Sequence, residues 1–385
     1  MKIKPFYTVC ILYLFANFLY LILGLYNENI FKMEFSQFYI ETSTLIFSFF
    51  LQILSLFILF LVYYFFEKKD FIERQFFENF SGFFLLIWQL FFLFSAVFFG
   101  LGVVGSENKT NQILVMISNF LSADLFYILI APSLKSNKYF KINSIVYLVS
   151  TLVRGWVGSV LIVFFIYLCR VGYLKINIKT FCIFIFIFIS ILLCLPFLID
   201  FKSSIRSSEG VEFDIKDYGN KLELAIDYLL GRFQHLGHTA LLLNHADEYR
   251  KLYELNKILP YWLEGIPQNF IYKVLGNNPV LTYSNTMAVY DFGAYSSEAW
   301  NANTGLSGWL VLLREKSILL ILYWILIIIC FFSFIYKYGN RQLFNVVSVF
   351  MIVYLYHGWF GAFFNLILLA FIIVFLKKIK FNGGY

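Results

Sequence analysis

Long apolar runs recur along this chain, and each approaches the length that a helix needs to cross a membrane. Seven of them lie at 6–26, 42–66, 80–104, 112–133, 180–199, 317–336 and 358–377, and three shorter ones at 142–153, 155–169 and 343–357. About 20 apolar residues in an α-helix span the ~30 Å of hydrocarbon in a bilayer. The runs therefore predict an all-α polytopic membrane protein with about ten transmembrane helices.

The composition excludes a soluble domain. Hydrophobic residues make up 61% of the chain and charged residues only 14%, whereas an ordinary soluble domain carries about 25% charged residues. The net charge of +7 is interpreted as positive charge at a membrane surface, and no basic groove for nucleic acid is expected. The whole chain, 1–385, is predicted to form one integral membrane domain.

The orientation is predicted from Lys and Arg, which collect in short loops on the cytoplasmic side of a membrane. With ten helices and both termini inside, sixteen basic residues fall on that side: Lys2, Lys4, Lys68, Lys69, Arg74, Lys135, Lys138, Lys141, Arg170, Lys175, Lys179, Lys337, Arg341, Lys377, Lys378 and Lys380. The short outer loops 27–41 and 105–111 carry only Lys32 and Lys109. The first apolar run is interpreted as an uncleaved helix, because no small-x-small cleavage site ends it.

The region 142–169 admits two interpretations, one long span or two short ones. A division at Arg154-Gly155 keeps the later basic loops inside and puts Arg154 at the outer boundary, which avoids the cost of a charge at mid-bilayer. Arg154 then either has a functional role or extends to the headgroups. Asp124, the acid nearest to mid-membrane, is expected to face the bundle, paired or hydrogen-bonded.

One large outer loop interrupts the series of helices. The chain leaves the membrane at Asp200, and a periplasmic loop over 201–308 is predicted between transmembrane helices 7 and 8. An apolar stripe at helical spacing predicts that this loop contains amphipathic helices. The members of the stripe are Leu222, Ile226, Leu229, Phe233 and Leu236.

Three of the four histidines lie in this loop, within YLLGRFQHLGHTALLLNHADEYRK at 228–251. On one continuous helix, His235, His238 and His245 would project within about 80° of one another, with Arg232 about 60° to the other side. Three interpretations compete. The first is a solvated helix face, and the second is a metal site, for which His at i,i+3 alone is a weak signal. The third is an active-site helix, with the Arg binding a phosphate and a His acting as base or hydrogen-bond donor.

Four segments carry a further signal. The first is STLVRGWVGSVLIVFFIYL, in which Arg-Gly opens a helix from the outside. Two lie in the large loop, LLGRFQHLGH and GIPQNFIYK. The fourth, NTGLSGWLVLLREKSILLILY, leads the chain from the loop back into the membrane. Together with ten or more helices, this layout resembles the Wzy family of O-antigen or capsule repeat-unit polymerases, in the O-antigen polymerase and ligase superfamily. Related polymerases often have an Arg where Gln268 stands, whereas the later Lys273 is kept.

The resemblance implies a membrane glycosyltransferase of lipopolysaccharide or capsule biosynthesis in the bacterial inner membrane, with its active site facing the periplasm. The enzyme would transfer a growing glycan from an undecaprenyl diphosphate carrier to a sugar hydroxyl of an incoming lipid-linked unit. A chain-length regulator and a flippase are implied as partners, and no cofactor or metal is implied. The diphosphate requires neutralising cations, and the candidates are Arg154, Arg232 and Lys273. The acceptor requires a base, expected to be His235 or His238, with rivals Glu264, Asp291 and Glu298.

Three alternatives stay open. An O-antigen ligase shares the architecture and transfers the glycan to the lipid A core. A lipid-linked oligosaccharide flippase, the non-enzyme alternative, would be expected to show repeated halves and polar residues inside helices. A glycosyltransferase of the mannosyltransferase type usually carries acids in its first outer loop, where this chain has Glu28, Glu34 and Glu41 but no Asp pair.

Overall fold

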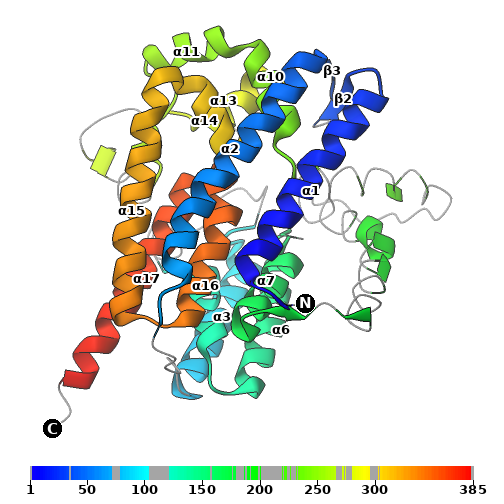
Figure 1. Cartoon of the computed structure of the whole chain (residues 1–385). Coiled ribbons are helices and arrows are strands. Elements are labelled where there is room, and N and C mark those ends of the chain that lie inside the picture. The colour runs from blue at the N-terminus through cyan, green and yellow to red at the C-terminus, as the bar shows by residue number, and fades with distance from the viewer. Residues whose placement is uncertain are drawn as a thin grey trace.

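The computed structural model describes most of the apolar part of the chain. The described residues are 2–33, 36–71, 79–103, 121–156, 158–175, 233–265, 280–294 and 304–382, with single positions and short pieces within 177–231 and 271–274 and at 302. These residues are mostly helical (Figure 1). Predictions that fall on 104–120, on most of 179–199 or on 201–218 lie outside the described residues.

Among the described residues, four stretches are long and apolar enough to cross a membrane. Three are the helices α1 (Pro5–Tyr26), α2 (Thr42–Glu67) and α3 (Asn79–Phe99), which match predicted runs. The fourth, Gly305–Tyr338, is interrupted. It consists of α14 (Gly305–Leu313), a 3₁₀ turn η4 (Arg314–Lys316) and α15 (Ser317–Tyr338). Arg314 has φ 48° and ψ −122°, which no helix allows, so α14 and α15 are separate helices.

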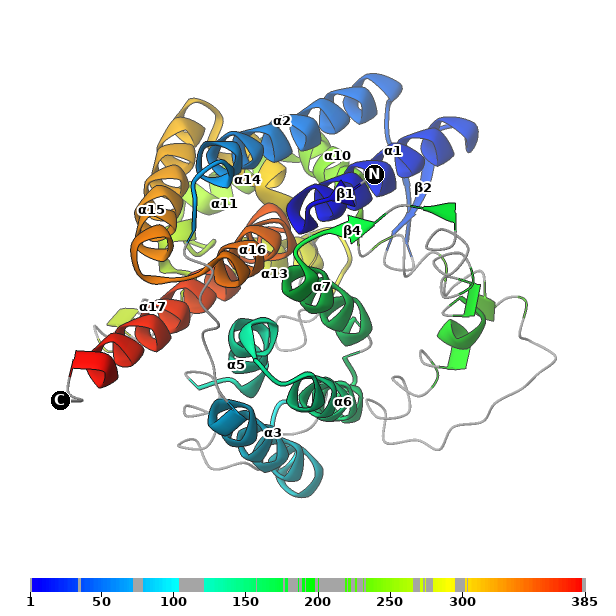
Figure 2. The ribbon, with the colours of Figure 1, turned by 60° about the horizontal axis from the view of Figure 1, so that its bottom comes forward.

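The remaining helices of the bundle are mostly shorter. They are α5 (Ala123–Ile130), continued by the 3₁₀ turn η1 (Ala131–Ser133), α6 (Asn137–Val153), α7 (Ser159–Val171), α16 (Arg341–Phe350), the π-helix η5 (Met351–Tyr356) and α17 (Phe360–Asn382). The predicted division of 142–169 is confirmed, because α6 ends at Val153, Arg154 caps it and Gly155 has φ +79°. Figure 2 shows α3, α5, α6 and α7 as one group on one side of α16. The helices α1, α2 and α15 lie on the other side of α16.

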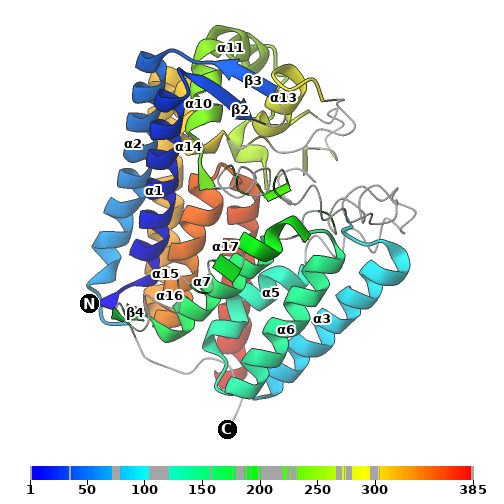
Figure 3. The same ribbon diagram turned by 90° about the vertical axis from the view of Figure 1, so that its right-hand side faces the viewer.

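Basic segments that are distant in sequence meet at one end of the bundle, at the lower left of Figure 3, where N and β4 are labelled. The strand β1 (Lys2–Ile3) pairs with β4 (Leu174–Lys175) in antiparallel register. Lys4 lies 2.6 Å from a carboxylate oxygen of Glu67. Arg341 donates at 3.1 Å to the carbonyls of both Glu67 and Lys69. The start of α1 and the segments following α2, α7 and α15 therefore share this end.

The opposite end carries the β2–β3 hairpin (Ile30–Met33 and Ser36–Tyr39) and the loop helices. The loop helices are α10 (Leu236–Asn244), α11 (Ala246–Glu254), α13 (Tyr283–Tyr290) and α14, with the 3₁₀ turn η3 (Tyr261–Leu263) between α11 and α13. The segment of the predicted amphipathic stripe, 222–236, is described only in part. Of the described loop helices, α11 is amphipathic, since Tyr249 is its one buried residue, whereas residues Leu236–Leu242 of α10 are all buried. The reason is that α10 packs against α2 and α14 at once and has no solvated face.

Two glycines allow the start of α14 to pack closely against the turn between η5 and α17. Gly305 and Gly358 have φ +69° and +87°, values that side chains with a Cβ rarely adopt. A Cβ at Gly358 would lie 3.2 Å from the Cα of Gly305. The start of α14 is thereby placed inside the bundle, and all nine of its residues are buried.

A third glycine permits a contact that can be tested by substitution. A Cβ at Gly361, in the first turn of α17, would overlap the backbone carbonyl oxygen of Glu264. Because backbone cannot rotate away, Gly361→Ala is expected to lower the free energy of unfolding by about 1–3 kcal/mol, the usual cost of overpacking. Thermal unfolding in detergent measures this loss of stability as a lower melting temperature. Gly158→Ala is the matched control, because nothing lies within 4 Å of its Cβ position. Equal melting temperatures for the two variants would contradict the contact.

Candidate functional site

A buried polar network joins the loop helices to the bundle. The Gln52 amide nitrogen donates to Thr239 Oγ1 at 2.9 Å and to Ser307 Oγ at 2.6 Å. Its oxygen accepts from the Tyr356 hydroxyl at 2.7 Å. Asn17 Oδ1 accepts from the backbone N–H groups of residues 235 and 236, at 2.9 and 3.1 Å. These bonds satisfy the otherwise unpaired donors at the start of α10 within an apolar core, and so hold α10 against α1 and α2.

Both histidines predicted as candidate bases lie in this core. His235 is fully buried and its ring meets that of His357 at a centroid distance of 4.4 Å and 82° between planes. His238 is also buried, with its ring 5.8 Å from that of Phe292. His357 was not a candidate, because it lies far from the loop in sequence and only the fold brings it to His235.

The single helical face predicted for the three loop histidines is wrong. α10 begins after His235 and ends at Asn244, and His245 has φ −109° and ψ +20° between α10 and α11. This break turns His245 away from the core. Arg232, predicted to share that face, lies outside the described residues, as do Lys273, Gln268 and Glu298.

His245 instead pairs with an acid. Its Nδ1 lies 2.8 Å from Oδ1 of Asp291, and the Tyr249 hydroxyl donates to Oδ2 at 2.6 Å. The Asp291 side chain is 4% exposed and the imidazole 40% exposed. Burial raises the pKa of the Asp291 carboxyl, while the hydrogen bonds from Tyr249 and His245 lower it, with a net increase. A buried acid therefore holds an imidazole that solvent reaches.

Two arginines share one carboxylate beside this pair. Arg250 Nη1 and Arg314 Nη2 lie 2.5 and 3.1 Å from the same oxygen, Oδ1 of Asp247. Asp247 is 80% and Arg314 58% exposed. Two guanidinium groups against one carboxylate leave one positive charge at the surface. Arg314 is also the residue in the unfavourable conformation between α14 and α15, and strain of this kind often marks functional positions.

The arginine cluster and the Asp–His pair lie around one tyrosine. Burial raises the pKa of the Tyr283 hydroxyl well above its usual range, the Asp291 charge raises it further, and the Arg250 charge lowers it. The Tyr249 ring lies 5.8 Å from the Tyr283 ring. Tyr249 donates to Asp291 and precedes Arg250 in α11, so the pair and the cluster lie beside Tyr283. His245, Asp247, Arg250 and Arg314 thus form one surface, which we call the α11 surface. Two buried residues support it, because Asp291 binds His245 and Tyr249 binds Asp291.

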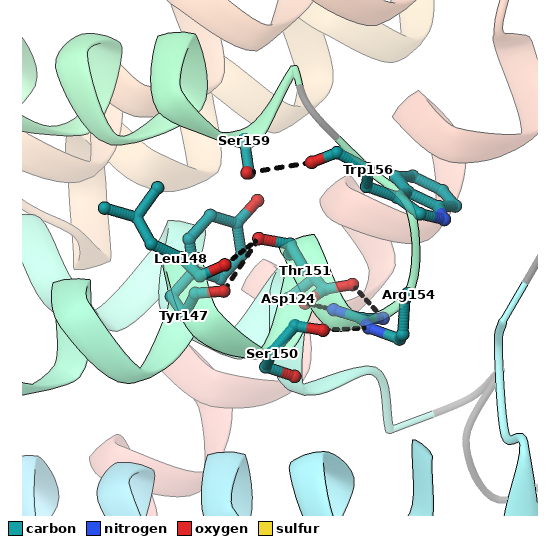
Figure 4. A network of polar contacts seen from close by, with 8 residues as sticks. All are labelled: Asp124, Tyr147, Leu148, Ser150, Thr151, Arg154, Trp156 and Ser159. Carbon is teal, nitrogen blue, oxygen red and sulfur yellow. Dashed lines mark hydrogen bonds and ion pairs between the residues drawn. The ribbon is translucent and has the colours of Figure 1, made fainter. Parts of the chain in front are cut away.

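Arg154, predicted as a phosphate ligand, is paired (Figure 4). Its Nη1 and Nη2 donate to the two oxygens of Asp124 at 2.9 and 2.7 Å, and Nε donates to the Ser150 carbonyl at 3.0 Å. The expectation that Asp124 is paired is confirmed. The guanidinium is buried rather than extended into solvent, so its charge is neutralised within the protein.

Glu264, a rival base in the sequence, acts as a helix cap. Its carboxylate accepts hydrogen bonds from the backbone N–H groups of Phe360 and Gly361, which open α17. Burial raises the pKa of the Glu264 carboxyl well above its usual range, and these two donors lower it. The net shift is upward, so this environment favours the neutral form of Glu264 at the start of α17.

The fold and the site define a broad class: a mostly helical protein whose long apolar helices are consistent with a membrane protein. A scan against protein-family models, a search of curated proteins and a search of solved structures found no match.

Proposed function

We propose that this chain is a membrane glycosyltransferase that polymerises lipid-diphosphate-linked oligosaccharide units at the α11 surface. The observation that carries the proposal is the arginine pair around Asp247 beside the His245–Asp291 pair. Diphosphate leaves readily once its charge is neutralised, and the planar guanidinium of Arg matches phosphate oxygens in a bidentate manner. A cationic surface with an adjacent acid–base group fits transfer to a sugar hydroxyl.

The proposed orientation follows the positive-inside rule. The end at which Lys2, Lys4, Lys175 and Arg341 meet is assigned to the cytoplasm, and the α11 surface then faces the periplasm of a bacterial inner membrane. Ten crossings and a periplasmic segment at 201–308 belong to this proposal. The undecaprenyl diphosphate carrier would lie in the bilayer, with its headgroup at the height of the α14–α15 turn.

Arg250 and Arg314 take the role that the sequence suggested for Arg154. Arg154 already donates to both oxygens of Asp124, whereas Arg314 shares its carboxylate and is mostly exposed. An incoming diphosphate can therefore replace Asp247 as the acceptor of the Arg314 hydrogen bonds. Arg232 and Lys273 remain further candidate cations from the sequence.

Purified protein in liposomes with lipid-linked repeat units tests the proposal. A polymerase lengthens the lipid-linked chain. A ligase forms product only when lipid A core is added, and a flippase moves the unit across the bilayer without changing its length. We expect lengthening, and we expect Arg314→Gln to slow it about 10²–10³-fold, the usual effect of removing one group that stabilises developing charge.

Lys316→Gln is the matched control, because it removes a positive charge from the same turn without touching Asp247. If the native protein forms no longer chain, the proposed polymerase function is wrong. If Arg314→Gln and Lys316→Gln both retain the native rate, the function stands and the arginine pair has no part in it.

A further inference from the structure

The His245–Asp291 pair combines a buried carboxylate with an imidazole that solvent reaches. Here the carboxylate is 4% exposed and the imidazole 40%. The Tyr249 hydroxyl binds the second oxygen of Asp291 at 2.6 Å, so both oxygens have partners and the carboxylate cannot rotate freely.

We propose that His245 is the general base that takes the proton from the acceptor hydroxyl, with Asp291 and Tyr249 as positioning residues. This inference rests on the proposed glycosyl transfer. It goes beyond that function by assigning the proton transfer to an imidazole between α10 and α11, in place of His235 or His238 in the core.

The geometry determines which nitrogen reacts. An ionised carboxylate only accepts hydrogen bonds, so the Nδ1 facing Asp291 carries the hydrogen and Nε2 keeps its lone pair. Nε2 lies on the opposite side of the ring from Asp291. Because the ring is partly exposed, a sugar hydroxyl can reach this nitrogen without entering the bundle. His235 and His238 are 0% and 3% exposed, so a sugar hydroxyl cannot reach their rings in this way.

The proposed step is balanced in atoms and charge. The acceptor oxygen forms a bond to the anomeric carbon of the donor glycan while its proton moves to Nε2 of His245. The bond from the anomeric carbon to the diphosphate oxygen breaks, and the lipid diphosphate leaves with the electron pair. The proton on Nε2 then passes to solvent, which restores the neutral imidazole for the next unit.

Burial of Asp291 also predicts how its substitution changes stability. Burial raises the pKa of its carboxyl above the usual range. An acid with a raised folded-state pKa contributes stability that is present below its unfolded pKa and lost as pH rises through the folded pKa. The ionised form of Asp291 therefore costs stability, and Asp291→Asn is expected to unfold at the same temperature as the native protein or above it.

His245→Ala gives the main test in the liposome assay. We expect chain lengthening to slow about 10²–10⁴-fold, the usual contribution of a general base, and added imidazole to restore part of the rate. A ring that only supports the fold would not be replaced by free imidazole. Lys251→Ala, an exposed change on α11, is the control and should keep the native rate. A native rate for His245→Ala overturns the inference, and so does a slow variant with a native melting temperature that imidazole does not rescue.

Asp291→Asn tests the positioning role. An amide at 291 can stabilise the wrong imidazole tautomer, so we expect kcat to fall about 10²–10⁴-fold with KM nearly unchanged. Glu254→Gln removes an acid from the exposed end of α11 and is the matched control. A lowered melting temperature for Asp291→Asn with a native kcat would show a structural role only and overturn the assignment. If the native protein itself forms no longer chain, the proposed function has failed, which is a separate outcome.

Discussion

Replacing Arg154 by Ala is expected to lower the free energy of unfolding by about 2–4 kcal/mol. Removing one partner of a fully buried ion pair costs roughly 3–5 kcal/mol, because the other charge stays desolvated without compensation. The Asp124 side chain is 23% exposed, so solvent offsets part of that cost. Denaturant unfolding of the purified protein in detergent measures the difference.

The double variant Arg154→Met, Asp124→Leu separates pairing from packing. If the loss in Arg154→Ala comes from an isolated Asp124 charge, an apolar pair of similar volume should recover most of the stability. We expect the double variant to unfold within about 1 kcal/mol of the native protein, since replacing buried pairs in this way is often neutral. A double variant less stable than Arg154→Ala would show that the ion pair itself holds α5 to α6.

Gln52→Met is expected to lower the free energy of unfolding by about 2–4 kcal/mol. Methionine fills a similar volume but makes none of the hydrogen bonds to Thr239, Ser307 and Tyr356. Each buried polar group left without a partner costs about 1–3 kcal/mol, and some of these groups can bond to one another, as Thr239 and Ser307 do at 2.9 Å. Thermal unfolding in detergent measures the loss.

Gln89→Met on α3 is the matched control. The Gln89 side chain is buried, and neither of its polar atoms has a hydrogen-bond partner among the residues that the structure describes. Replacing a buried amide of this kind by a thioether removes a desolvation cost, so this variant should be as stable as the native protein or more stable. Equal losses at Gln52 and Gln89 would mean that the network around Tyr356 contributes nothing to the fold.

The long helices were predictable because the signal for them is local. An apolar run reports the environment of its own side chains, and the runs at 6–26, 42–66 and 317–336 form α1, α2 and α15 nearly as expected. The division at Arg154-Gly155 was also visible, since a charge and a glycine together disfavour a continuous span. The pairing of Asp124 followed from the cost of an isolated acid in an apolar setting.

The candidate site was less predictable, because helical periodicity assumes an unbroken helix. The projection of three histidines onto one face depended on continuity through residue 245, where the chain turns. Arg314 lies in NTGLSGWLVLLREKSILLILY, just before the apolar run at 317–336, and was not among the predicted site residues. Its place beside Asp247 depends on a backbone conformation that its own sequence does not favour.

The sequence by itself determined that the chain is helical and apolar enough for a membrane, and where its longest helices begin and end, because burial in lipid acts on each segment separately. Only the tertiary structure decided that His235 and His238 are enclosed while His245 faces outward. It also decided that Asp291 lies beside His245 and that Arg250 and Arg314 share Asp247. These pairings join residues from α11, α13 and the α14–α15 turn, and their energies depend on distances that no local pattern encodes.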